Sequence, residues 1–347
     1  MKLKIAGGCG EHGRNCFYIE GEEISFLFDC GLMAGEKDCY PHLTRNEIEK
    51  ARFLFLSHSH QDHTGALPWL YENGFSGKII ATRETIEELP FELNAPVFLQ
   101  DIAPEKKGNL SGLSIEWGRS GHAVGSVWYS LFLAGKTILY SGDYIEDTQL
   151  YICDNLRARR ADLAILDCAY GRDKTPYNYA TRLVEHTKEL LDRYNLIVFP
   201  VPKYGRGVEL AALFTNQNIT ASIKGDEHFE NEMKKIGALP FRYKAEIPKS
   251  GKYSKTIFFI SDPQLRSKSA RALIDSLLDQ GGRAIMTGTI EIGSYSQSLI
   301  EKGNMEYLRY PVHTNYGGFS SLLKQNDFAK AIAFHSEDFC YPKEIEF

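Results

Sequence analysis

One short segment, LSHSHQDHTG, concentrates side chains that bind metal ions. It contains His58, His60, Asp62 and His63 directly after an apolar run that predicts a strand. Because residues two apart in an extended segment point the same way, His58 and His60 can meet one ion, while the following turn brings Asp62 and His63 toward a second. Imidazole and carboxylate suit zinc, although iron and manganese accept similar ligands. The segment therefore predicts a metal site, against the alternative of surface histidines clustered by coincidence.

Three more candidate ligands stand at the ends of other expected strands. His122 lies in SGHAVGS, Asp143 in LYSGDY and His335 in AIAFHSED. Taken singly, each can be read as a hydrogen-bonded loop residue. A single short segment cannot complete a site for two ions, so the joint occurrence of these residues favours a shared metal centre.

The elements around these residues change character along the chain. Up to Gly171, short apolar or alternating runs separated by Gly, Asn and Asp predict two packed sheets flanked by helices. From Pro176, helical and strand-like stretches alternate, which predicts a mainly parallel α/β unit. We expect an α/β protein with a core at 1–174, an inserted domain at 175–304 and a return to the core at 305–347.

Composition narrows the class of protein further. The net charge of −5 argues against a broad basic nucleic-acid surface. Basic residues are frequent in one late part of the chain, and they can be read either as a local basic channel or as an ordinary solvated surface. They are Lys203, Arg206, Lys252, Lys255, Arg266, Lys268 and Arg271. The seven scattered cysteines, with no Cys-x-x-Cys pair, favour reduced thiols and a cytoplasmic location. We expect neither a signal peptide nor a membrane-spanning stretch.

Four motifs in order resemble the metallo-β-lactamase superfamily: FLFDCG, LSHSHQDHTG, SGHAVGS and YSGDY. The resemblance implies an αββα sandwich whose strand ends hold two zinc ions per chain. It assigns His58, His60 and His122 to one ion and Asp62, His63 and His335 to the other, with Asp143 between them. It makes Asp29 of FLFDCG the acceptor of a hydrogen bond that orients a ligand, although a structural buried acid is the alternative.

Later motifs are similar to those of the β-CASP nucleases, the branch that includes ribonuclease J: LAILDCAYG, KYGRGVEL, PVHTNYGG and AIAFHSED. This resemblance implies an inserted domain, cleavage of phosphodiester bonds in RNA, and His313 as general acid with Asp167 holding its ring. We expect Asp62, His313 and Asp167 as the catalytic residues. The chain departs from the pattern in its short insertion and in Asn315, where an acid is usual.

Other assignments depend on weaker patterns. The glycines of KYGRG allow close approach of a substrate, and Arg206 can pair with phosphate, so Gly205 and Arg206 are expected to bind substrate. The remaining histidines are interpreted as surface or packing residues: His12, His42, His186 and His228. His335 at the last motif favours RNA over DNA by family resemblance, and a homo-oligomer stays open. The alternatives are a small-molecule hydrolase of thioesters, lactones or cyclic phosphodiesters, and a non-catalytic scaffold.

Overall fold

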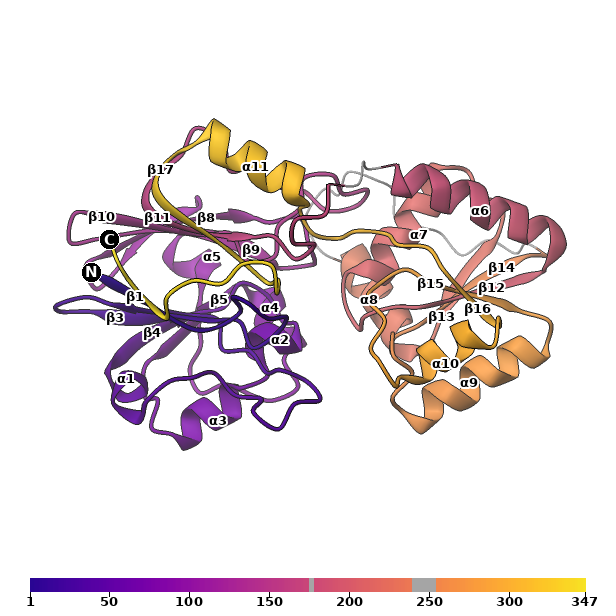
Figure 1. The fold of residues 1–347 in the computed structure, drawn as a ribbon, viewed down its shortest axis with the longest axis horizontal. Helices are drawn as coiled ribbons and strands as arrows, with labels where there is room; N and C mark the ends of the chain where they lie inside the picture. Colours follow the sequence, from indigo (N-terminus) through magenta and orange to yellow (C-terminus); the bar gives the residue numbers. More distant parts are fainter. Residues whose placement is uncertain (175–177, 239–253) are drawn as a thin grey trace. The chain divides into compact units, whose positions relative to one another are not determined.

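The computed structural model describes residues 1–174, 178–238 and 254–347. The chain divides into two compact units (Figure 1). The first unit consists of Met1–Glu146, Cys153–Lys174 and His313–Phe347, and the second of Asp147–Ile152 and Thr175–Val312. The return to the first unit thus falls at His313, whereas the sequence placed it at residue 305, and the short segment 147–152 also joins the second unit.

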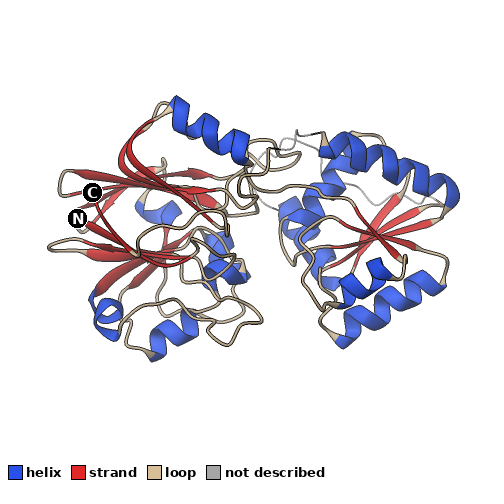
Figure 2. Ribbon diagram, in the orientation of Figure 1, coloured by secondary structure: helices blue, strands red, loops and turns tan. Residues whose placement is uncertain are grey.

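The first unit contains two sheets that lie face to face (Figure 2). One has seven strands in the order β18, β1, β2, β3, β4, β5, β6, with the bounds β1 (Lys2–Gly7), β2 (Cys16–Glu20), β3 (Ser25–Phe28), β4 (Ala51–Phe55), β5 (Lys78–Ala81), β6 (Val97–Phe98) and β18 (Glu344–Glu346). The other has six in the order β17, β11, β10, β9, β8, β7, with the bounds β7 (Lys107–Leu110), β8 (Leu113–Arg119), β9 (Val127–Leu133), β10 (Lys136–Tyr140), β11 (Arg160–Asp167) and β17 (Asp327–Phe334).

Aromatic side chains fill the space between the two sheets. Phe28 of β3 lies 4.8 Å from the ring of Tyr140 on β10, and Phe55 of β4 lies 5.4 Å from Tyr129 on β9. Each buried aromatic ring removes a large apolar area from water, so this layer contributes to the stability of the unit. It also fixes the distance between the two sheets whose strand ends carry the candidate ligands.

Helices cover the outer faces of both sheets. The helices of this unit are α1 (Arg45–Lys50), α2 (Gln61–Thr64), α3 (Leu67–Glu72), α4 (Arg83–Glu88), α5 (Leu99–Ile102) and α11 (Tyr316–Gln325). By contrast with the outer helices, α5 packs between the sheets, where Leu99 belongs to the same cluster as Phe28 and Tyr140. Strand β2 is buried on both faces because Phe17 points into the layer between the sheets while Tyr18 packs in the cluster that includes Leu67 of α3. On the other sheet, Phe319 of α11 packs in one cluster with Leu166 of β11. The expected helix–sheet–sheet–helix class is confirmed.

The second unit is built on one parallel sheet of five strands in the order β13, β14, β12, β15, β16. The strands are β12 (Leu196–Pro200), β13 (Ser222–Gly225), β14 (Thr256–Ile260), β15 (Arg283–Met286) and β16 (Met305–Tyr307). The helices are α6 (Tyr179–Arg193), α7 (Arg206–Asn216), α8 (Glu227–Ala238), α9 (Lys268–Asp279) and α10 (Tyr295–Glu301). They lie on both faces of the sheet (Figure 2), which explains why strands such as LIVFP are apolar runs rather than alternating ones.

Within the described residues, no helix is long and apolar enough to cross a membrane.

Candidate metal centre

The candidate ligands converge because parallel strands end at the same edge of a sheet. Strands β10, β11 and β17 are parallel neighbours, and Asp143, Asp167 and His335 follow or end them. In the facing sheet, β3 and β4 are parallel, so Asp29 and the segment with His58 also come together. His60 is the residue before α2, and this short helix carries Asp62 and His63.

Close backbone packing holds α2 against the end of β3. The Asn15 amide donates to the Asp62 carbonyl at 2.9 Å, and the Cys30 amide donates to the His63 carbonyl at 2.8 Å. A side chain on Gly31 would collide with the Asp62 carbonyl oxygen, which is why FLFDCG ends in glycine. Two ligand-bearing segments are thereby fixed to each other through their main chains.

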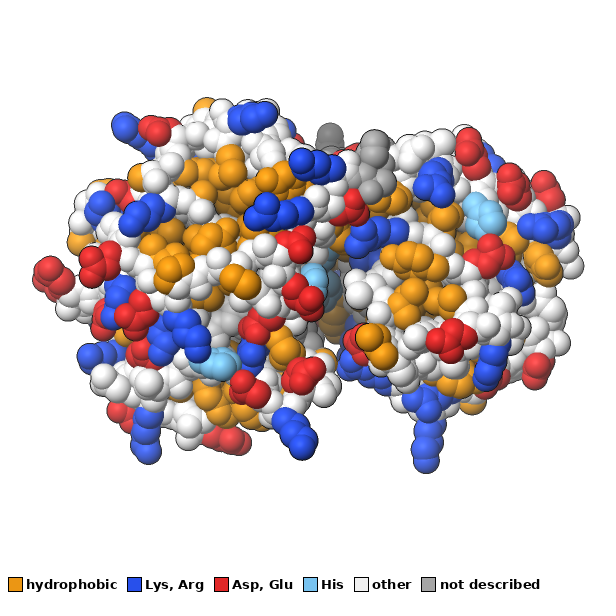
Figure 3. Space-filling model, viewed as in Figure 1, with side chains coloured by type: hydrophobic (Ala, Val, Ile, Leu, Met, Phe, Trp, Pro, Cys, Tyr) orange, Lys and Arg blue, Asp and Glu red, His pale blue; other side chains and the backbone are white. Residues whose placement is uncertain are grey.

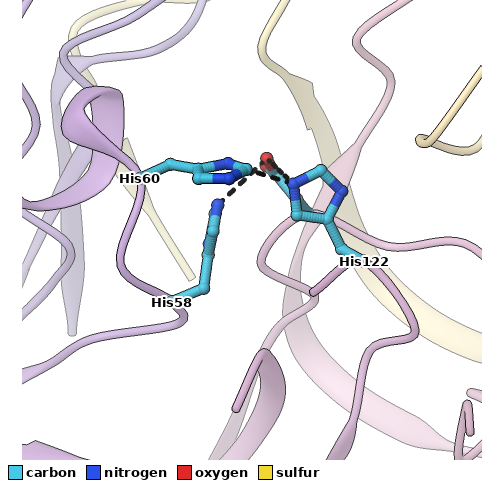
Figure 4. Close-up of side chains that lie close together, drawn as sticks. His58, His60 and His122 are labelled. Atoms are coloured by element: carbon cyan, nitrogen blue, oxygen red, sulfur yellow. Dashed lines mark hydrogen bonds and ion pairs between the residues drawn. The ribbon is translucent and has the colours of Figure 1, made fainter. Parts of the chain in front are cut away.

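The first group of donor atoms belongs to His58, His60, His122 and Asp143, which all lie within 4.8 Å of one another. Figure 4 shows the rings of His58, His60 and His122 turned toward a common point. His122 Nε2 lies 3.2 Å from His60 Nδ1, and one Asp143 oxygen lies 3.4 Å from both His58 Nε2 and His122 Nε2. Three imidazole nitrogens facing one carboxylate oxygen are the donor set of a tetrahedral zinc site.

The second group consists of Asp62, His63 and His335. His335 Nε2 lies 3.1 Å from Asp62 Oδ2. The other oxygen of Asp143 lies 3.1 Å from His63 Nε2 and 3.3 Å from His335 Nδ1. Asp143 therefore turns one oxygen to each group.

Unpaired buried atoms test whether a metal fits this arrangement. Among the described residues, His58 Nε2, His335 Nδ1 and both oxygens of Asp143 are buried and make no hydrogen bond. Buried polar atoms are normally hydrogen-bonded because an unmade bond costs about 1 to 3 kcal/mol. These nitrogen and oxygen atoms instead face one another, so a divalent cation bound among them would give each atom a partner. The residues present therefore fit the zinc ions that the family resemblance implies.

The pKa shifts of the clustered histidines also favour a cation at this site. Burial, together with the nearby His58, lowers the pKa of His60 to about 3, and burial also lowers the pKa of His122 well below its usual range. Burial would lower the pKa of His335 as well, but the carboxylates of Asp143 and Asp62 outweigh it and raise the pKa to about 10. The carboxylates thus attract positive charge at this point, and a divalent cation supplies such charge.

Asp29 forms a hydrogen bond with the ring nitrogen of His63 that faces away from Asp143. Its carboxylate accepts hydrogen bonds at 2.7 Å from His63 Nδ1, from the Ser57 amide and from the Ser57 hydroxyl, and another from the Tyr140 hydroxyl at 2.5 Å. With Nδ1 donating, the lone pair of His63 is left on Nε2, the atom that faces Asp62 and Asp143. The sequence did not single out Ser57, Tyr140 or Asn15, whose side-chain amide lies 2.9 Å from His63 Nε2.

His313 and Asp167 form a pair beside the cluster. His313 Nδ1 lies 3.0 Å from Asp167 Oδ2, and the Asp167 carboxylate also accepts from the Tyr144 amide at 2.9 Å and the Ala169 amide at 3.0 Å. The ring of His313 lies 4.6 Å from that of His122. Because Asp167 occupies Nδ1, the opposite ring nitrogen is the one that can exchange a proton with a substrate.

Gly205 and Arg206 belong to the second unit. The Gly205 amide donates to Glu232 Oε1 at 2.7 Å, and Arg206, at the start of α7, is buried. The amide is therefore already engaged by a carboxylate, and an anionic ligand would have to displace it.

Two members of the late basic set, for which a channel and a solvated surface were the alternatives, are engaged in ion pairs as well. Lys255 lies 3.4 Å from Asp192, and Arg266 pairs with Glu291. Lys252 lies outside the described residues. On the face shown in Figure 3, lysines and arginines are interspersed with acids.

Comparison with known proteins places this site in a family. The family model described as the metallo-beta-lactamase superfamily matches residues 9–182, and the chain belongs to that superfamily. A protein named as a probable RNase from Methanocaldococcus jannaschii is 27% identical over 315 residues, which cover 83% of this chain and 72% of the relative. Cleavage and polyadenylation specificity factor 73 of Drosophila melanogaster is 26% identical over 253 residues, covering 63% of this chain and 36% of the relative.

A third relative is a ribonuclease of Thermus thermophilus, 27% identical over 212 residues, with 55% of this chain and 49% of the relative covered. These relatives are β-CASP nucleases, which confirms the resemblance drawn from the motifs. The chain spans less than half the length of the second and third relatives. A solved structure from Enterococcus faecalis, of a protein of unknown function, shares the fold with a TM-score of 0.64 and 13% identity, covering 97% of this chain and 94% of that one.

Proposed function

We propose that this protein is a zinc-dependent hydrolase that cleaves phosphodiester bonds in RNA. The observation that carries the proposal is Asp143, a buried carboxylate whose two oxygens face two separate groups of histidine nitrogens. The similarity to proteins named as ribonucleases supports RNA as the substrate class.

Two zinc ions would be held by the two donor groups. His58, His60 and His122 would bind one, and Asp62, His63 and His335 the other, with Asp143 shared. When bound, such ions would supply positive charge that polarises a phosphate oxygen and lowers the pKa of a bound water molecule. Asp29 keeps His63 in the orientation and tautomer that this role requires.

Side chains of the protein would donate the proton that the reaction requires and orient the attacking water. We assign His313 to donating a proton to the leaving oxygen, while Asp167 fixes the ring through Nδ1. Asp62 is the more accessible of the two clustered acids, with its side chain 30% exposed against 1% for Asp143. Its free oxygen can therefore orient the attacking water by accepting a hydrogen bond.

The finer assignments remain part of the proposal. They include the cytoplasmic location, which the seven free cysteines support, the assignment of residues 175–304 to an inserted domain, and substrate contact by Gly205 and Arg206. A preference for RNA over DNA and assembly into a homo-oligomer are likewise predictions, and no membrane partner is proposed.

One experiment tests the central claim. Zinc-loaded protein is incubated with end-labelled single-stranded RNA, with matched DNA, and with thioester, lactone and cyclic phosphodiester substrates, and the product ends are identified. We expect RNA fragments or single nucleotides, with DNA cut more slowly. Equal turnover of RNA and DNA would refute the RNA preference, and ester or thioester hydrolysis without RNA cleavage would overturn the proposal in favour of a small-molecule hydrolase.

A further inference from the structure

An exposed imidazole lies beside the candidate metal ligands. The side chain of His12 is exposed, and its ring centroid lies 5.8 Å from that of His335 in an edge-to-face arrangement. His12 is also within electrostatic reach of Asp62 and His313. It therefore stands at the solvent side of the cluster, next to both the second donor group and the proton-carrying histidine.

The loop that carries His12 is held in one shape by its own side chains. The Glu11 carboxylate accepts from the Gly8 amide at 3.1 Å and from Arg14 Nε and Arg14 Nη2, both at 2.7 Å. Arg14 also donates to the Asp38 carbonyl at 2.7 Å. Residues 8–14 thus form a closed, hydrogen-bonded turn, which differs from the usual mobility of a surface loop.

The same loop is joined to the backbone around His335. The His335 amide donates to the Gly8 carbonyl at 2.6 Å, and the Gly10 amide donates to the Ser336 carbonyl at 3.1 Å. Gly10 has a φ of +73°, and a Cβ there would lie 2.9 Å from Cys340 Sγ, so this close approach requires glycine. His12 and His335 therefore share one backbone frame, which holds the main chains that carry the two rings close together.

The ring of His12 keeps its hydrogen-bonding capacity for a ligand. Within residues 1–174, 178–238 and 254–347, no group makes a hydrogen bond or ion pair with it. Two other histidines outside the cluster differ, since His42 lies 3.2 Å from Asp38 and His186 lies 2.7 Å from Glu306. An imidazole carries at least one N–H group whether neutral or protonated, so His12 can donate to an anionic oxygen.

We propose that His12 donates a hydrogen bond to a non-bridging phosphate oxygen of the strand bound at the cluster, and thereby sets the affinity for substrate. This assignment rests on the proposed ribonuclease function. Its physical basis is a rigidly held, exposed donor beside the groups that would hold the scissile phosphate. The fixed frame reduces the entropy lost on binding, so one hydrogen bond can have a measurable effect on affinity.

Three variants of the zinc-loaded full chain test the contact: His12→Ala, His12→Gln and, as control, His42→Ala. We expect His12→Ala to keep its zinc and to raise KM for single-stranded RNA by about tenfold, as expected for losing one hydrogen bond to a charged group. His12→Gln should recover most of the affinity because its amide also donates, and a purely structural role would not give this recovery. His42→Ala should match the unsubstituted protein.

A second measurement separates this proposal from the ribonuclease proposal. Binding of inorganic phosphate is followed in the unsubstituted protein and the three variants, together with the ring ¹⁵N–¹H signal of His12. If RNA is cut and His12→Ala leaves both KM and phosphate affinity unchanged, the His12 contact is overturned and the ribonuclease stands. If RNA is not cut but His12→Ala still weakens phosphate binding, the proposed ribonuclease function is refuted, whereas the contact between His12 and phosphate is supported. Loss of zinc from His12→Ala would make His12 a structural residue and overturn the assignment.

Discussion

Asp143 in the first unit and Glu209 in the second are both buried carboxylates, but their surroundings differ. In the second unit, Glu209 is 3% exposed and accepts hydrogen bonds from a set of four donors: the Thr148 hydroxyl, the Gln149 and Leu150 amides and the Tyr310 hydroxyl. In the first unit, Asp143 is 1% exposed, and neither of its oxygens has a hydrogen-bond donor among the described residues. Histidine nitrogens face Asp143 instead.

The two environments shift the pKa values in opposite directions. Burial raises the pKa of Glu209, and its hydrogen bonds only partly offset the burial. Burial would also raise the pKa of Asp143, but the neighbouring His63 and His335 outweigh it and lower the pKa well below the usual range. A buried acid with all its hydrogen bonds made is part of the structure, whereas a buried acid kept charged without them indicates a site for a cation.

Replacing Asp143 should give the largest effect. Asp143→Asn removes the charge shared by the two donor groups, so we expect loss of bound zinc and a fall in RNA cleavage of roughly a thousandfold or more, because several kcal/mol of charge stabilisation disappear. Elemental analysis and a ribonuclease assay measure the two effects. Full zinc content in this variant would show that Asp143, like Glu209, has a structural role and is not needed for metal binding.

Replacing His313 should separate proton transfer from metal binding. His313→Ala is expected to keep its zinc and its fold but to lose cleavage by about a hundredfold, the usual scale for a general acid. The matched control is His186→Ala, since His186 forms a histidine–carboxylate pair with Glu306 in the second unit and should leave cleavage unchanged. Zinc lost together with activity would instead make His313 a ligand.

Glu209→Ala tests the structural acid. Four donors lose their acceptor, and we expect the free energy of unfolding to fall by about 2 kcal/mol while the zinc content stays the same. Chemical denaturation measures the loss, and Glu301→Ala, which removes an exposed acid of the same unit, is the control. A loss of zinc comparable to that of Asp143→Asn would contradict the distinction between the two carboxylates.

The smallest expected effect is a pH dependence of stability at Glu209. Because its pKa in the folded state is raised above the ordinary value of 4.5, the folded protein binds this proton more tightly than the unfolded chain does. The resulting stabilisation is fully present below the ordinary pKa and is lost as the pH rises through the raised value. The stability of the unsubstituted protein relative to Glu209→Gln should therefore decrease as the pH rises from acid toward neutrality, as measured by denaturation at several pH values. A flat or increasing difference would be incompatible with a raised pKa.

The sequence predicted the sandwich and the inserted parallel unit because both depend on local patterns. Alternating or apolar runs define strands, and LSHSHQDHTG carries a dense cluster of donor side chains. The structure brings the named residues together, although their roles as ligands remain a proposal. The partners of these residues could not be predicted, since Asn15 meets His63 and Tyr140 meets Asp29 only after distant strands have paired.

Two other features could not be predicted from the sequence either. The segment 147–152 joins the second unit through Glu209, about sixty residues further along the chain. His12 has no motif that distinguishes it from a surface histidine, and its place became visible only once residues 8–14 were joined to the backbone around His335. In both cases the missing information was a contact between remote segments.

The pairing of β11 with β17 sets the order in which the protein can become active during synthesis. These strands are parallel neighbours, yet the whole of α6 to β16 is made between them, so His313 and His335 leave the ribosome after the second unit. Domains generally fold as units while the chain emerges. An unfinished chain would carry the first group of donors, but neither His335, the proposed ligand, nor His313, the proposed proton donor. Under the proposed function, a nascent chain would therefore be unable to cut the messenger RNA from which it is being translated.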